Sequence, residues 1–153
     1  MTMRLTSVTR LVAVCLIAGA TVTAASSAVA RDAKGVLYDC DMQPSKTNDF
    51  WISTKIGIVV LNDGSVVVSD GVSLNYPGGT ARAALQRNTD REMRLDWRLA
   101  GGIGKSKDRE FLLPDAEYSA VIEKPSNRIH VRGWLPEFRK RFSGSGTCTP
   151  RVK

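Results

Sequence analysis

Apolar and polar residues alternate over short stretches of this chain, and the pattern is clearest in Glu92–Leu99. Its apolar positions are Met93, Leu95, Trp97 and Leu99, and a charged residue precedes each of them. Successive side chains of a β-strand point to opposite faces, so this stretch predicts a half-buried strand with Trp97 in the core. We interpret its charged positions as a solvated face with cross-strand ion pairs rather than as a binding site.

Two β-branched runs, Ile56–Leu61 and Ser65–Ser69, flank the turn residues Asn62-Asp63-Gly64. Asn and Asp tolerate turn geometry and Gly takes the positive φ of a tight reversal, so the pattern predicts an antiparallel hairpin. Both faces of this hairpin are apolar. The outer face carries Val59, Leu61 and Val67. These residues either suit an exposed pleated surface or form an interaction face that a partner covers.

Further short strands are expected along the chain, separated by Gly, Pro and Asn residues. They are Val36–Met42, Phe50–Thr54 leading into the hairpin, Val72–Tyr76, Glu110–Leu113, Glu117–Glu123, Arg128–Trp134 and part of Glu137–Thr149. The segment Ala100–Asp115 is expected to be mostly irregular, and Gly144-Ser145-Gly146 is expected to form a bulge or bend. About eight strands with short turns predict an all-β fold, a small antiparallel meander that closes into a barrel. A two-sheet sandwich is the alternative.

The N-terminal segment has the pattern of a secretory signal peptide. Arg4 and Arg10 precede or flank the short apolar run Leu11–Ala20, and Ala28-Val29-Ala30 fits a cleavage site. The apolar run is too short for a permanent membrane span, and no second such run follows. Lipid attachment at Cys15 is a weaker alternative. We therefore expect residues 1–30 to be removed and residues 31–153 to form a single periplasmic or extracellular domain.

Removing the signal peptide leaves two cysteines, Cys40 and Cys148, near the two ends of the domain. In an exported protein, two such cysteines predict a disulfide. The bond would tie the first strand to the last, which favours a sheet whose two ends lie together.

The chain is basic, with a formal net charge of +7. Two clusters of cations stand out. They are Lys105, Lys107 and Arg109 in the irregular segment, and Arg139, Lys140 and Arg141 shortly after Trp134. We expect these residues to form a basic rim, with Trp134 nearby, that binds an anionic ligand such as an envelope phosphate or sugar-acid polymer, a lipid head group or an acidic protein surface. The alternative is that the charge serves solubility alone. If Phe138 and Phe142 both point inward, Lys140 shares their face and reaches the barrel rim.

The catalytic and cofactor motifs that we considered are incomplete. Gly104-Lys105-Ser106 resembles the end of a phosphate-binding loop, but Leu99 stands where that motif needs its first Gly. His130 is the single histidine and lies in the outward phase of its strand, so we expect neither a metal site nor a nucleophilic triad. No cofactor and no nucleic-acid partner are expected.

Carboxylates near the irregular segment leave one enzymatic alternative, a carboxylate-based hydrolase. They are Asp108, Glu110, Asp115 and Glu117. Neighbouring cations make solvated charge pairing the favoured interpretation, and a non-enzymatic binding module is the expected function.

An exported, disulfide-closed small β-barrel is similar in architecture to periplasmic lysozyme inhibitors and to lipocalin-like modules. The resemblance rests on architecture alone, since no motif of this chain matches. An inhibitor of a cationic enzyme would present an acidic surface, whereas this chain is basic.

Overall fold

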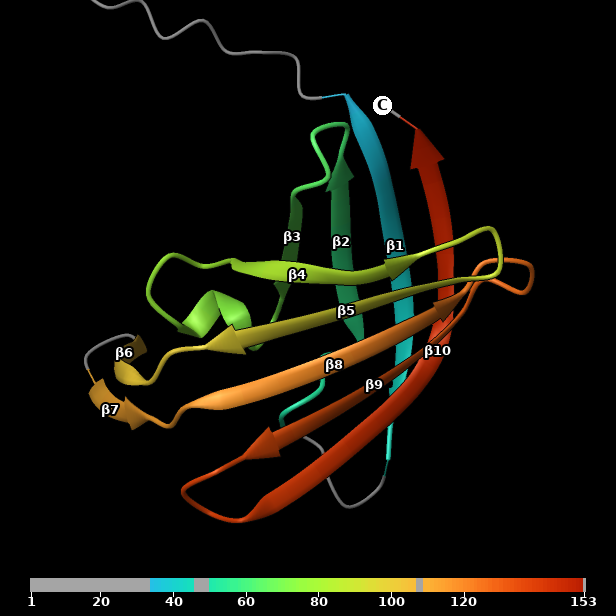
Figure 1. The fold of residues 1–153 in the computed structure, drawn as a ribbon. Coiled ribbons are helices and arrows are strands. Elements are labelled where there is room, and N and C mark those ends of the chain that lie inside the picture. The colour runs from blue at the N-terminus through green and yellow to red at the C-terminus, as the bar shows by residue number, and fades with distance from the viewer. Residues whose placement is uncertain (1–33, 46–49, 107–108, 153) are drawn as a thin grey trace, which may run out of the picture. The chain divides into compact units, whose positions relative to one another are not determined.

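The computed structural model describes residues 34–45, 50–106 and 109–152. Within them the fold is all-β, and eight antiparallel strands form one closed barrel (Figure 1). The barrel strands are β1 (Gly35–Pro44), β2 (Lys55–Leu61), β3 (Val66–Asp70), β4 (Ala81–Asn88), β5 (Glu92–Leu99), β8 (Ala116–Glu123), β9 (Arg128–Leu135) and β10 (Lys140–Val152). The predicted signal peptide lies outside the described residues.

The strand order around the barrel is β1-β10-β9-β8-β5-β4-β3-β2, and all neighbours are antiparallel. The fold is therefore the predicted meander, closed as a barrel rather than split into a sandwich. A separate hairpin of β6 (Gly102–Ser106) and β7 (Arg109–Leu113) is inserted between β5 and β8.

Several local predictions differ from the structure, and the strand β4 was not among the predicted strands. Phe50–Thr54 is a turn and bend segment, and β2 begins only at Lys55. Val72–Tyr76 contains the 3₁₀ helix η1 (Ser73–Asn75) instead of a strand. Ala100–Asp115, expected to be mostly irregular, contains the β6–β7 hairpin. The η1 turn forms because Ser73 hydrogen-bonds back to Asp70, which reverses the chain directly after β3.

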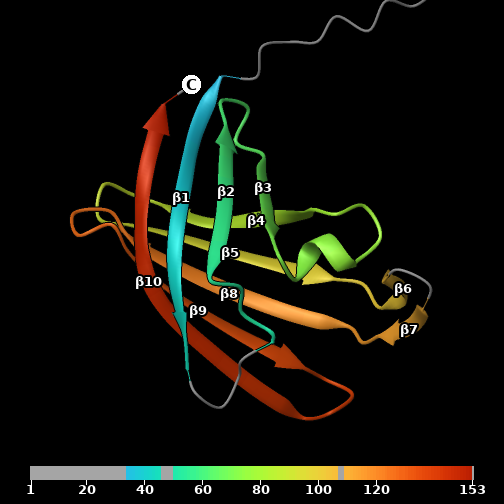
Figure 2. The ribbon, with the colours of Figure 1, turned by 180° about the vertical axis from the view of Figure 1, so that it is seen from behind.

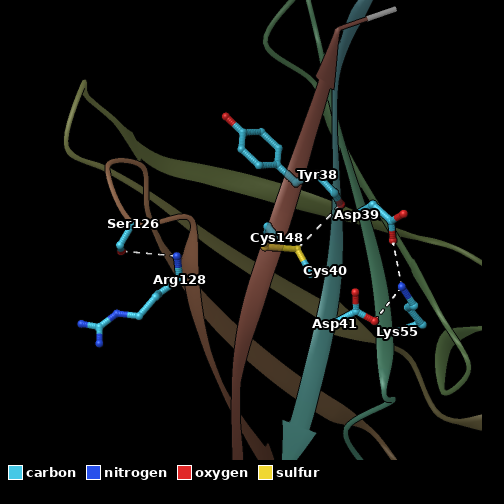
Figure 3. The surroundings of a disulfide bond; sticks show 8 residues. All are labelled: Tyr38, Asp39, Cys40, Asp41, Lys55, Ser126, Arg128 and Cys148. Carbon is cyan, nitrogen blue, oxygen red and sulfur yellow. Dashed lines mark hydrogen bonds and ion pairs between the residues drawn. A yellow bond between two sulfur atoms is a disulfide. The ribbon is translucent and has the colours of Figure 1, made fainter.

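The barrel closes where β1 meets β10, and a disulfide joins Cys40 to Cys148 at directly paired positions (Figure 3). Both cysteines are buried. The pairing of β10 with β1 and β9 continues without a shift through Gly144 and Gly146, so the predicted bulge is absent there. A Cβ at Gly146 would overlap the carbonyl oxygen of Asp41, so the glycine is what permits the close approach of the two strands.

Aromatic rings fill one part of the barrel interior. Trp97 stacks on Tyr118 with ring centroids 5.0 Å apart, and Tyr118 meets Phe142 edge-on at 5.5 Å. Trp51 lies 6.1 Å from Phe142. Gly133 lies under the Phe142 ring, where a Cβ would overlap the ring atoms. Trp97 is buried as its alternating stretch predicts.

The two ends of the barrel differ in their connections (Figures 1 and 2). At one end, which we call the loop end, lie residues 45, 50–54, 71–80, 100–106, 109–115 and 136–139. At the other end, the turn end, lie residues 62–65, 89–91 and 124–127 together with the described chain termini. An up-and-down meander places successive connections at alternate ends, so all the long connections gather on one side.

Candidate functional site

An open groove of about 1050 Å³ runs over the outer face of the barrel. Most of its side chains come from the outward positions of β4, β5, β8, β9 and β10, and the buried rings of Trp97, Tyr118 and Phe142 also contribute to its lining. The charged and aromatic lining residues on this face are Arg82, Asp96, Arg98, Glu117, His130, Arg132, Trp134 and Arg141. Asp96 and Arg98 belong to the charged face that the sequence assigned to solvent.

Trp134 and Arg141 are directly opposite each other on β9 and β10. The guanidinium carbon of Arg141 lies 5.3 Å from the Trp134 ring centroid, which is a cation–π arrangement. The ring holds the guanidinium against the sheet, and the N–H groups of the guanidinium stay available to a ligand. Arg planes stacked in this way bind carboxylates and phosphates through two parallel hydrogen bonds.

His130 orients a second arginine of the groove. The Arg132 Nε–H donates to His130 Nε2 at 3.2 Å, so the imidazole carries its hydrogen on Nδ1. The Nδ1–H then donates to Ser145 Oγ at 3.0 Å. This chain, running from β9 to β10, fixes the guanidinium of Arg132 at the groove surface. His130 is half-buried and lies in the outward phase, as the sequence predicts.

The arginines of the groove are only partly balanced by carboxylates. Arg98 pairs with Asp115, whereas Arg82, Arg132 and Arg141 have no ion pair with any described residue. Asp96 and Glu117 of the groove are likewise outside every ion pair of the described residues. Three unpaired guanidinium groups therefore face two carboxylates on this surface, and its local charge is positive.

Asp115 fastens the base of the inserted hairpin to the barrel. Its carboxylate accepts a hydrogen bond from the Gly101 backbone N–H at 2.6 Å and also pairs with Arg98. The Gly101 hydrogen bond and, after it, the Arg98 guanidinium hold the pKa of Asp115 below its usual value. This carboxylate is thus occupied by structural contacts, which speaks against its serving as a general acid.

The residues of the predicted basic rim are distributed over two connections of the loop end. Arg139 lies in the β9–β10 turn, and Lys140 is the first residue of β10. Lys105 and Arg109 pair in register with Glu110 and Ser106 within the β6–β7 hairpin. Lys107 and Asp108 lie outside the described residues.

Of the predicted rim, the structure brings Trp134 and Arg141 into contact with each other. Phe142 is buried but Phe138 is exposed, and Lys140 is exposed at the barrel rim. Arg82 and Arg132 were not predicted from the sequence as site residues. The outward row His130, Arg132 and Trp134 carried a usable signal, because a cation and an aromatic residue share one face of a single predicted strand.

The predicted interaction face is a row across three strands. Val59 of β2 lies opposite Val67 of β3 on one side and Leu37 of β1 on the other. Val59, Val67 and Leu61 are all half-buried. Neighbouring side chains thus cover part of each of these residues.

No family model, no curated protein sequence and no solved structure matches this chain. Across the described ranges, no three His, Cys, Asp or Glu side chains gather as a metal-binding group. No helix in the same ranges is long and apolar enough to cross a membrane. The geometry of the groove is therefore the basis on which a function is proposed.

Proposed function

We propose that this protein is an exported, non-enzymatic β-barrel that binds an anionic ligand in the outer groove. The observation that carries the proposal is the set of three arginines, Arg82, Arg132 and Arg141, that line one groove without a carboxylate partner among the described residues. Unpaired guanidinium groups gathered on one surface attract anions and bind them through charge-assisted hydrogen bonds.

Pre-organisation of two of these arginines supports the same function. Arg141 is held by the Trp134 ring and Arg132 by His130. A guanidinium that is already oriented loses less side-chain freedom when a ligand binds, so more of the interaction energy appears as affinity. Phosphate and carboxylate groups fit this fork geometry best.

The volume and location of the groove indicate the size of the ligand. A volume of about 1050 Å³ accommodates a small molecule or a few units of a polymer. The groove is open to solvent along the sheet, so a polymer chain can enter it without threading. Phosphate- or uronate-bearing polymers of the cell envelope are therefore the ligand class that we propose. The remaining rim cations, Arg139 and Lys140, lie at the adjoining loop end and add to the attraction of anions.

Binding of polyphosphate and of polygalacturonate, measured by calorimetry at low and high salt, tests the proposal. The Arg132→Gln/Arg141→Gln double variant is expected to bind at least about tenfold more weakly than the unmodified protein. Neutral dextran is expected to give no signal. Affinity for the polyanions should fall with salt, because exposed charges are screened.

Arg128→Gln is the matched control. Arg128 lies on the same strand as Arg132 and is exposed, but it pairs with Glu123 at 3.1 Å and does not line the groove. The Arg128→Gln substitution removes one positive charge, as each of the two groove substitutions does. We expect an effect within about twofold. If the control weakened binding as much per charge as the groove variants, net charge and not the groove would account for the binding.

A further inference from the structure

Exposed apolar side chains are unevenly distributed over the two ends of the barrel. Among the described residues the large exposed ones are Phe50, Leu74, Ile103, Phe111, Leu112, Phe138 and Val152. All but Val152 lie in the connections of the loop end, and each of the four connections there contributes at least one. The three turns of the opposite end consist of small, polar and charged residues and a single proline.

Hydrogen bonds hold the bases of these connections in place. The Tyr118 hydroxyl donates to the Trp51 carbonyl at 3.0 Å, next to the exposed Phe50. The Tyr76 hydroxyl donates to the Pro114 carbonyl at 2.8 Å, which joins the η1 connection to the end of the inserted hairpin. The exposed side chains therefore project from connections that these hydrogen bonds fix to the rest of the protein.

A second groove, of about 830 Å³, opens among the same connections. Its lining is mainly apolar and includes Phe50, Trp51, Val72, Phe111 and Leu113. The exposed Phe50 and Phe111 stand on its wall, so the apolar surface continues from the tips into the groove. An apolar surface of this kind, unfavourable in water, gains free energy when hydrocarbon replaces the solvent.

Two cations stand directly beside one of the exposed apolar side chains, Phe138. Phe138 is followed by Arg139 and Lys140, both exposed and neither in an ion pair with a described residue. The four-residue turn that carries Phe138 places it at the extremity of the β9–β10 connection. Apolar side chains flanked by Lys and Arg are the pattern of a surface that inserts into the interface of an anionic bilayer.

We propose that the loop end docks onto the surface of an anionic lipid bilayer, with Phe50, Leu112 and Phe138 entering the head-group region. A protein interface concentrates its apolar residues in one contiguous, shape-complementary core. Here they stand on four separate connections with polar residues between them, a distribution that a fluid lipid surface accommodates.

This docking surface goes beyond the proposed anion-binding function. The two share the cations Arg139 and Lys140, but the inserting apolar side chains do not line the outer groove. The test is cosedimentation of the disulfide-bonded protein with vesicles of phosphatidylcholine alone and of phosphatidylcholine with phosphatidylglycerol. All variants carry the same N-terminus. Phe50→Ser/Phe138→Ser is expected to weaken binding to both vesicle types by about tenfold per side chain. Arg139→Gln/Lys140→Gln is expected to weaken binding to the anionic vesicles alone, by about fivefold per charge.

Val152→Ser is the matched control, because Val152 is the exposed apolar residue of the turn end. It is expected to bind vesicles as the unmodified protein does. The proposal is overturned if the unmodified protein does not bind anionic vesicles at low salt. It is also overturned if the correctly folded Phe variant binds them normally, or if the Phe variant instead dissociates a complex with a protein.

The two proposals fail separately. Arg132→Gln/Arg141→Gln should abolish most binding of soluble polyanions and leave the apolar part of vesicle binding intact. The Phe50→Ser/Phe138→Ser variant should lose the apolar part of vesicle binding and bind soluble polyanions as the unmodified protein does. Thermal unfolding of each variant establishes that it is folded, and exposed positions such as these are expected to tolerate substitution.

Discussion

The two ends of the barrel are built from the same eight strands, yet they are held together in different ways. At the turn end the side-chain hydrogen bonds of the connections join residues a few positions apart, and backbone hydrogen bonds such as that from Lys124 N–H to the Arg91 carbonyl join one turn to another. Asp63 accepts hydrogen bonds from Ser65, and Ser126 donates to Glu123. At the loop end side-chain hydrogen bonds also join segments that are far apart in the sequence. Tyr76 reaches Pro114 across 38 residues, and Tyr118 reaches Trp51 across 67 residues.

This difference separates what stabilises the barrel from what is available for binding. Short polar turns close adjacent strands and present little surface to a ligand. Longer connections, supported from below by buried tyrosines, display apolar and cationic side chains. Loops on a rigid scaffold commonly carry the binding residues of a protein, and here both grooves lie at or beside the loop end.

The largest expected effect comes from the disulfide that holds the scaffold of both ends. Cys40→Ala/Cys148→Ala removes a link across a sequence separation of 108 residues. In the chain-entropy model we expect a loss of about 4–5 kcal/mol in the free energy of unfolding, measured with urea. Reductant should lower the stability of the unmodified protein by a similar amount and leave the double variant unchanged. A loss below about 1 kcal/mol would mean that the β1–β10 ladder closes the barrel by itself.

Gly133→Ala acts on the aromatic cluster that supports the loop end. The new methyl group would overlap the Phe142 ring, which packs against Tyr118 and Trp51. We expect a loss of about 1–3 kcal/mol in the free energy of unfolding, with a change in near-ultraviolet circular dichroism.

Gly57→Ala is the matched control in a strand interior. Its new Cβ would meet the Ser69 carbonyl oxygen at 3.6 Å, an ordinary contact. We expect its stability to stay within about 1 kcal/mol of the unmodified protein. Equal losses in the two variants would show that glycine itself, and not the Phe142 overlap, sets the cost.

The smallest effects expected are two pH dependences of opposite sign, one at each end. Asp70, beside η1, is buried, and desolvation raises its pKa above the ordinary value of 3.8 despite hydrogen bonds from Ser73. The folded state binds the Asp70 proton more tightly than the unfolded state does. The free energy of unfolding therefore falls as the pH rises from 3.8 through the raised pKa. Asp70→Asn keeps an acceptor for the Ser73 N–H and removes the buried charge. The variant should therefore become more stable relative to the unmodified protein as the pH rises through this window.

Asp63 at the turn end should behave in the opposite way. It is exposed, and hydrogen bonds from the Ser65 hydroxyl and N–H hold its pKa below 3.8. Its contribution is present above 3.8 and is lost as the pH falls through the lowered pKa. Asp63→Asn should be less stable than the unmodified protein at neutral pH, and the difference should vanish in acid. Thermal unfolding of both variants between acid and neutral pH checks the two signs, and slopes of the same sign would contradict this assignment.

The residues of the groove differ in how far the sequence predicts their contacts. The contact between Trp134 and Arg141 follows from a hairpin that neighbouring residues define. Arg82 lines the same groove from β4, far from Trp134 and Arg141 in the sequence, and no local pattern around it predicts this. The exposure of Phe138 was also not predictable, because an apolar residue in a short turn resembles part of a strand until the position of the chain reversal is known.

The sequence by itself determined the all-β class, the meander, the hairpins that turn at residues 62–65 and 124–127, and the pairing of Cys40 with Cys148. These features depend on alternation with a period of two, on turn chemistry and on a choice between few cysteines, all of which are local or countable. Only the tertiary structure decided that Val72–Tyr76 turns as η1, that Ala100–Asp115 forms a hairpin and that three unpaired arginines share a groove. The shared groove depends on which distant strands become neighbours when the barrel closes. By contrast, η1 and the hairpin form from contacts within their own segments, which the alternation of apolar and polar residues does not report.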